Sequence, residues 1–102
     1  MSKINKLFEE SINIKQEILN SNILNVIERM GDEISHSIKN GGKMMLCGNG
    51  GSAADAQHLA AEMLIRLRPN YNRQGVPAIA LAQDVSTITA CSNDFGFDHL
   101  FE

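Results

Sequence analysis

The sequence predicts an α/β fold in which a parallel sheet is flanked by helices and preceded by two N-terminal helices. Two observations support this prediction. Short apolar runs at residues 43–47 and 77–81 are separated by a glycine-rich loop and a stretch of helix-forming residues. Such an alternation of strand and helix is typical of a parallel sheet. In the first forty residues, by contrast, apolar side chains recur mostly at spacings of three and four, as on one face of a helix.

The N-terminal part predicts two amphipathic helices, at residues 4–19 and 23–38, interrupted by the polar residues 20–22. The pair Gly41-Gly42 is typical of a helix C-terminus and ends the second one. An amphipathic helix needs a surface against which to bury its apolar face. We therefore expect these two helices to pack against the rest of the domain or against another subunit.

The next segment predicts a strand–helix–strand unit. Residues 43–47 and 77–81 are continuous apolar runs, as in buried parallel strands. The connecting helix is predicted at residues 53–67 and is ended by residues 68–70, and residues 71–76 are predicted as a polar loop. The apolar stripe of this predicted helix is formed by Ala54, Leu59, Met63 and Leu67.

The last part predicts a short helix at residues 85–90 and a loop at residues 92–97. Asp98 is a suitable N-cap for a helix that would begin where the sequence stops. No glycine, proline or basic last turn closes that helix. We therefore expect the chain to be truncated, that is, part of a longer one.

The composition excludes several classes of protein. The chain has 102 residues, 43% of them hydrophobic, and a net charge of −3, which suits one small globular unit. An acidic chain is poorly suited to bind nucleic acid, and no apolar run reaches the roughly 18 residues of a membrane span. Without a secretory signal, a cytoplasmic protein is expected. Cys47 and Cys91 are then expected to be reduced, buried thiols.

The glycine-rich loop at residues 48–52 predicts an anion site. Glycines let the backbone approach a ligand closely, and the helix that follows offers unpaired N–H groups, so phosphate is the usual occupant. Two alternatives remain. The loop could be a plain tight turn with Ser52 as the helix N-cap, or a dinucleotide-binding turn, although Asp84 lies too far along the chain for the acidic residue that such a turn needs.

Two groups of polar residues could carry chemistry. His58 and Glu62 lie four positions apart on the predicted helix, so they share one face and could bind one metal ion or form an acid/base pair. An ordinary exposed pair is the alternative. Asp84, Asn93 and Asp94 follow the second strand, where ligands bind in open α/β sheets. They could contact sugar hydroxyls, or they could simply be turn residues.

Residues 47–62, which read CGNGGSAADAQHLAAE, resemble the sugar isomerase (SIS) family and, within it, the phosphoheptose isomerases. Residues 77–81 and 93–97 agree with the same family, and the resemblance covers the whole chain. It implies a SIS-type parallel sheet in a flavodoxin-like three-layer arrangement. Residues 1–102 would be the N-terminal part of a single SIS domain, with a helical segment at 1–40 and the start of the α/β core at 41–102.

The same resemblance implies a set of site residues and a homotetramer. His58 and Glu62 would bind zinc, whose remaining ligands lie beyond residue 102, and Glu62 would also be the catalytic acid/base. Because half of the site is missing, residues 1–102 alone are expected to be inactive. The residues implied to line the sugar phosphate are Asn49, Gly50, Gly51, Ser52, Glu62, Asn93 and Asp94.

The implied reaction is the conversion of sedoheptulose 7-phosphate to D-glycero-D-manno-heptose 7-phosphate, which supplies heptose for lipopolysaccharide or capsule. A base would move a proton between C1 and C2 through an enediolate, while zinc stabilises the negative oxygen. The alternative is a non-catalytic relative, such as the DnaA initiator-associating protein or a sugar-phosphate sensor. Such a binder needs no acid/base residue, so Glu62 beside His58 favours the enzyme.

Overall fold

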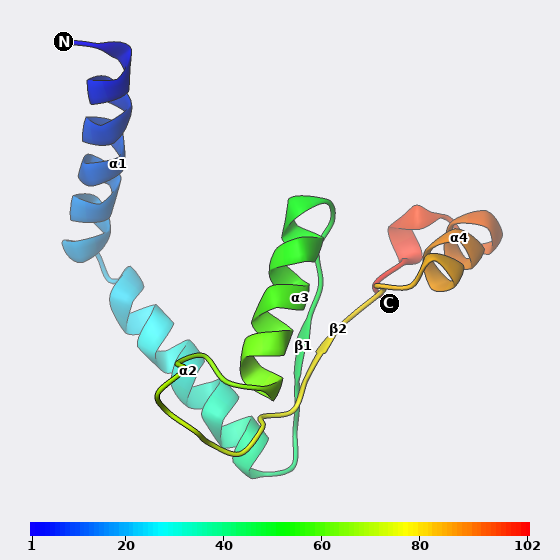
Figure 1. Cartoon of the computed structure of the whole chain (residues 1–102). Coiled ribbons are helices and arrows are strands. Elements are labelled where there is room, and N and C mark those ends of the chain that lie inside the picture. Colours follow the sequence, from blue (N-terminus) through cyan, green and yellow to red (C-terminus); the bar gives the residue numbers. More distant parts are fainter. The chain divides into compact units, whose positions relative to one another are not determined.

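A computed structural model describes all residues from Met1 to Glu102 (Figure 1). The chain divides into two compact units, residues 1–36 and 37–102, which we describe separately. The elements, in chain order, are α1 (Lys3–Leu19), α2 (Ile23–Lys39), β1 (Met44–Leu46), α3 (Gly51–Leu64), β2 (Ala78–Ala80), α4 (Val85–Asp94) and the 3₁₀ helix η1 (Phe97–His99). The order confirms the predicted α/β class with two leading helices.

Local capping signals mark the start of α1 and the end of α2. Ser2 is the N-cap of α1, and its hydroxyl accepts a hydrogen bond from the Asn5 N–H. At the C-terminus of α2, Gly41 has a φ of +87°, a conformation that side-chain-bearing residues rarely adopt. The N–H groups of Gly41 and Gly42 bond back to the carbonyls of Ile38 and Ser37. This pattern is a Schellman motif and confirms the predicted helix end.

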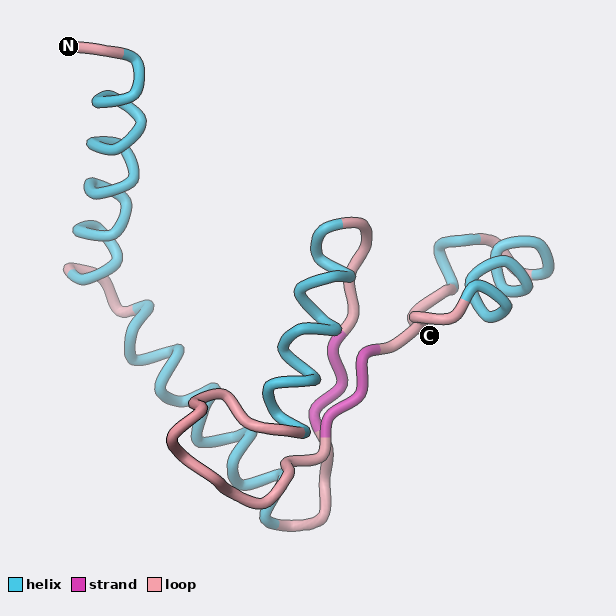
Figure 2. Tube along the Cα trace, in the orientation of Figure 1, coloured by secondary structure: helices cyan, strands magenta, loops and turns pink.

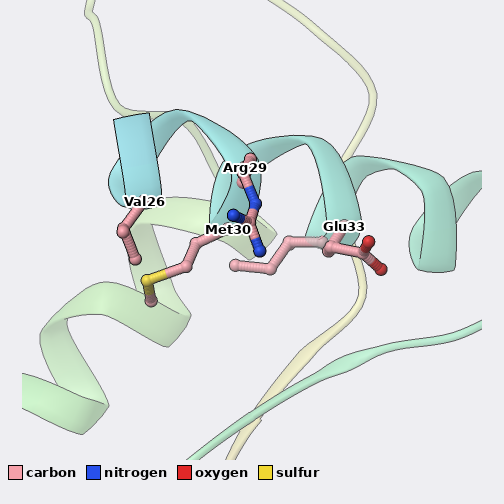
Figure 3. A pocket seen from close by; sticks show the side chains of 5 residues that line it. Val26, Arg29, Met30 and Glu33 are labelled. Carbon is pink, nitrogen blue, oxygen red and sulfur yellow. The ribbon is translucent and has the colours of Figure 1, made fainter. Parts of the chain in front are cut away.

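The apolar faces of α1 and α2 are open. Neither helix contains a buried residue, and Ile27, for example, is 54% exposed. Figure 3 shows side chains along one face of α2 that border a shallow hollow of about 290 Å³. Its lining consists of Val26, Arg29, Met30, Glu33 and Ile34, none of which is a predicted site residue.

In the second unit, β1 and β2 form a two-stranded parallel sheet and α3 connects them (Figure 2). Met44 is in register with Ala78, and the Leu81 N–H donates to the Leu46 carbonyl over 2.8 Å. Helix α3 packs on both strands. The buried residues are Ala56 and Ala60 on α3 and Ala78 on β2. Small side chains at all three positions let the helix approach the sheet closely.

Several predictions about burial were wrong. The strands are covered by α3 on one face only, so Met45 and Ile79 are 63% and 47% exposed rather than buried. The face of α3 that meets the sheet is formed by Ala56 and Ala60, not by the larger apolar residues of the predicted stripe. Among those larger residues, Leu59 is exposed. Cys47 is an exposed free thiol, whereas Cys91 is half-buried and free.

Three predicted boundaries also differ. Helix α3 ends at Leu64, three residues earlier than expected, and α4 continues to Asp94 rather than stopping at residue 90. Asp98 lies inside η1, whose N-cap is Gly96 with no side-chain hydrogen bond. None of the helices combines the length and the apolar character that a membrane span needs.

Candidate functional site

The glycine loop enters α3 through a tight turn. Gly50 is the N-cap, with a φ of 55° and a ψ of −121°, which only glycine adopts readily. The Ser52 N–H donates to the Asn49 carbonyl over 2.9 Å and closes the turn. Ser52 therefore lies within the first turn of the helix, and the alternative in which its hydroxyl caps the helix is wrong.

The start of α3 is open to a ligand. The N–H groups of Gly50 and Gly51 make no hydrogen bond within the chain, and a Cβ added to Gly51 would meet nothing within 4 Å. Gly48 differs, because a Cβ there would lie 2.6 Å from the Ser52 Cβ and 2.7 Å from its carbonyl oxygen. Gly48 thus serves the close packing of the loop on the helix. Gly50 and Gly51 present free N–H groups at a helix N-terminus, where anions bind favourably.

A hollow of about 450 Å³ lies between the end of β1 and the first turns of α3. It brings Ser52 of the glycine loop together with Asp55, one turn further along the helix. The rest of its lining is mainly apolar and consists of Met45, Leu46, Cys47, Ala56 and Leu59. The hollow gives a ligand at the glycine loop a concave surface to occupy.

His58 and Glu62 form a pair on α3. The Nε2 atom of His58 lies 3.3 Å from Oε1 of Glu62, and the two side chains are 74% and 28% exposed. At 3.6 residues per turn, both project from the side of α3 opposite the buried Ala56 and Ala60. The pair can therefore meet a ligand or another protein segment without disturbing the contact between α3 and the sheet.

The chemistry of this pair fits part of a zinc site. An imidazole nitrogen and a carboxylate oxygen are both common zinc ligands, but zinc takes four donors. The chain contains no group of three or more His, Cys, Asp or Glu side chains that could hold a metal ion. His58 and Glu62 therefore fit as two donors of such a site.

The polar residues after β2 lie at the two ends of α4. Asp84 is the N-cap of α4 and accepts hydrogen bonds from the Thr87 hydroxyl and N–H, which together lower the pKa of its carboxyl below the usual 3.8. Asn93 and Asp94 lie in the last turn of α4 rather than in a loop, and the Asn93 amide donates to Asp94 over 3.0 Å. Figure 1 shows α4 apart from α3. The structure thus does not bring Asn93 and Asp94 to the His58–Glu62 pair.

Comparison with known proteins identifies the family. A family profile described as SIS domain matches residues 7–102. The chain belongs to the SIS domain family. Its glycine loop and the His58–Glu62 pair therefore lie in a SIS domain.

Known relatives of this SIS domain chain are phosphoheptose isomerases. The chain is 59% identical to the phosphoheptose isomerase of Chlorobaculum parvum over 76 residues, which cover 74% of this chain and 36% of the relative. It is 41% identical to that of Thermodesulfovibrio yellowstonii over 99 residues, 97% of this chain and 48% of the relative. The chain thus spans at most about half the length of these relatives.

Solved structures agree with the fold. The phosphoheptose isomerase of Francisella tularensis matches 99% of this SIS domain chain with a TM-score of 0.84 and 39% identity, and 53% of that structure is covered. The enzyme of Neisseria gonorrhoeae matches 97% of the chain with a TM-score of 0.73 and 41% identity, and 49% of that structure is covered. These likenesses show that the chain has a SIS fold.

Sequence reasoning missed one residue of this SIS domain that bears on the site. Arg73 lies in the connection predicted only as a polar loop. Its guanidinium donates to the main-chain oxygens of Glu62 over 2.6 Å and Met63 over 2.8 Å. The sequence could have indicated it through an absence. The last turn of α3 contains no basic residue of its own, so its carbonyls need a donor from another segment.

Proposed function

We propose that the complete protein is an aldose–ketose isomerase that converts sedoheptulose 7-phosphate to D-glycero-D-manno-heptose 7-phosphate. The observation that carries this proposal is the His58–Glu62 pair on the helix that starts at the glycine loop. One helix thereby presents both a phosphate-binding end and an acid/base group. The names of the similar proteins, phosphoheptose isomerases in each case, support the same reaction.

We assign the substrate's anionic and polar groups to the residues around the start of α3. Asn49, Gly50, Gly51 and Ser52 would line the sugar phosphate, because two N–H groups of this segment have no partner within the chain. A bound phosphate would also interact favourably with the positive end of the helix dipole. Asn93 and Asp94 would contact the sugar only if α4 lay nearer to α3 in the complete protein.

Glu62 is the proposed catalytic base. Its carboxylate would take a proton from C1 of the ketose and deliver one to C2, while the proton of the C1 hydroxyl passes to the C2 oxygen. Together these two transfers yield the aldose with no net gain or loss of protons. His58, 3.3 Å away, would orient the carboxylate. Glu62 is more shielded from water than His58, which favours proton transfer to a bound sugar over exchange with solvent.

His58 and Glu62 would also bind zinc, with further ligands from outside residues 1–102. When bound, the metal would stabilise negative charge that develops on the sugar oxygens during proton transfer. The donor types of the two residues support this assignment. The proposal requires the same carboxyl group to serve as ligand and as base.

We further propose that the protein is a cytoplasmic homotetramer that supplies heptose for lipopolysaccharide or capsule. The open apolar faces of α1 and α2 support the assembly, since buried apolar area stabilises association. Large apolar side chains at least 40% exposed on these helices are Ile4, Leu7, Phe8, Ile12, Ile14, Leu19, Ile23, Leu24, Val26, Ile27 and Met30.

The direct test is turnover. The complete protein, supplied with zinc and sedoheptulose 7-phosphate, should form the aldose, which can be followed by NMR of the anomeric protons. A non-catalytic relative would bind the sugar phosphate with no conversion. Binding without conversion, at full zinc occupancy, would therefore contradict the proposal and favour a regulatory role.

A further inference from the structure

The C-terminal end of α3 is stabilised by residues 73–76, which lie nine to twelve residues beyond its last residue, Leu64. The last carbonyls of a helix have no partner within it, and α3 has no basic side chain in its last turn. Residues 73–76 provide both a charge and hydrogen-bond donors. The Arg73 guanidinium donates to the oxygens of Glu62 and Met63, and the Val76 N–H donates to the Met63 oxygen over 2.9 Å. We call residues 73–76 the α3 clamp.

The clamp fits closely. A Cβ on Gly75 would lie 2.6 Å from the Leu64 oxygen, so glycine permits the approach. Arg73 is itself half-buried, and it also donates to the Gln74 oxygen over 3.1 Å. Its positive charge lies at the negative end of the helix dipole, where it is stabilising. The guanidinium therefore donates to three carbonyl oxygens.

Glu62 lies in the turn that the clamp holds. Terminal helical turns open most readily, because few of their backbone groups are paired. Glu62 is about three helical turns from the glycine loop, so its carboxylate is placed by the end of α3 that needs support. His58 lies one turn earlier, inside the helix, and needs no such support.

We propose that Arg73 is a positioning residue that fixes the Glu62 carboxylate by holding the last turn of α3. The inference rests on the proposed isomerase function. Arg73 does not contact the substrate, and it acts through the main-chain oxygen of Glu62. Its loss should leave the glycine loop intact while the last turn opens, so that the carboxylate is correctly placed for only part of the time.

The test compares Arg73→Met, Arg73→Lys and Arg68→Met in the complete protein. Methionine keeps much of the side-chain bulk without the donors, and lysine restores the charge and some donors. Arg68 is exposed and lies outside the clamp, so it is the control position. Because small misplacements of a catalytic group can cost up to about 10²-fold in rate, Arg73→Met should lower kcat by about ten- to a hundredfold. KM should stay near the wild-type value. Arg73→Lys should recover part of kcat, and Arg68→Met should behave as wild type.

Hydrogen exchange of the peptide covering residues 61–66 should be faster in Arg73→Met and unchanged in Arg68→Met. An unchanged kcat in Arg73→Met would overturn the inference. A decrease in kcat that is matched by an equal rise in KM, and that Arg73→Lys does not relieve, would overturn it too. If Arg73→Met does not fold, full wild-type kcat in Arg73→Lys with altered exchange would overturn it as well. An inactive wild-type protein would instead contradict the proposed function. The same turnover assay detects that failure before any variant is compared.

Discussion

His58 and Glu62 approach to 3.3 Å across one turn of α3, and the carboxyl group of this pair is the better shielded member. Their face of the helix is directed away from the sheet, so neither side chain is needed for the packing of Ala56 and Ala60. Substitutions at the two positions can therefore separate chemistry from folding.

Glu62→Gln should lower kcat by about 10² to 10⁴, the usual contribution of a general base. The amide keeps the shape of the side chain but cannot accept a proton from carbon. Substrate affinity, measured by calorimetry with the sugar phosphate, should change far less, because the glycine loop is untouched. Glu28→Gln on α2 is the matched control and should leave kcat unchanged. Near-normal turnover of Glu62→Gln would show that Glu62 is a structural residue.

His58→Ala should act through the metal. Removal of the imidazole takes away one donor, so the purified variant should contain less zinc per chain than the wild type. Added zinc should restore part of its activity, whereas Glu62→Gln should stay inactive at any zinc concentration. The check is zinc content by atomic emission together with a zinc titration of turnover. Equal zinc retention in wild type and His58→Ala would exclude His58 as a ligand.

Two glycines of the loop should respond in opposite ways. Gly51→Val should abolish sugar-phosphate binding and leave the melting temperature near that of the wild type, because a Cβ at Gly51 meets no atom of the chain. Gly48→Ala should lower the melting temperature, since its Cβ would lie 2.7 Å from the Ser52 carbonyl oxygen. Calorimetric binding and thermal melts of both variants test the pair. Unchanged affinity in Gly51→Val would contradict the anion site.

The stability of the first turn of α4 should depend on pH. Asp84 is fully exposed, and its pKa is lowered in the folded state by hydrogen bonds from the Thr87 hydroxyl and N–H. Its capping contribution is therefore present above the unfolded pKa of about 3.8 and is lost as the pH falls through the lower folded value. An NMR pH titration of the Thr87 amide should report this loss. Asp84→Asn should remove the transition. Asp98→Asn should retain it, because the Asp98 carboxyl of the wild type caps no helix.

Assembly should depend on the apolar face of α2. Ile27→Asp should weaken self-association, since burial of an isoleucine side chain contributes about 1.5–3 kcal/mol for each protomer. Asn25→Asp introduces the same side chain and charge on the other side of the helix and should leave assembly unchanged. Sedimentation velocity of the complete protein distinguishes the two. A monomeric wild type at micromolar concentration would rule out the proposed tetramer.

The sequence alone determined the features that depend on neighbouring residues. The spacing of apolar side chains predicted α1 and α2, and the Gly41-Gly42 pair predicted the end of α2, because a Schellman motif uses only the last turn and the two residues after it. The four-residue spacing of His58 and Glu62 likewise places them together on any regular helix. The glycine loop required a turn before α3 for the same local reason.

Only the tertiary structure decided where α3 ends and which of its faces is buried. Leu67 continued the apolar period. The α3 clamp, however, donates hydrogen bonds to the carbonyls of Glu62 and Met63 from ten to thirteen residues away, and the helix stops at Leu64. Likewise, Ala56 and Ala60 face the sheet because their small side chains allow close approach. Both outcomes depend on contacts between segments distant in sequence, which a local pattern of residue types does not encode.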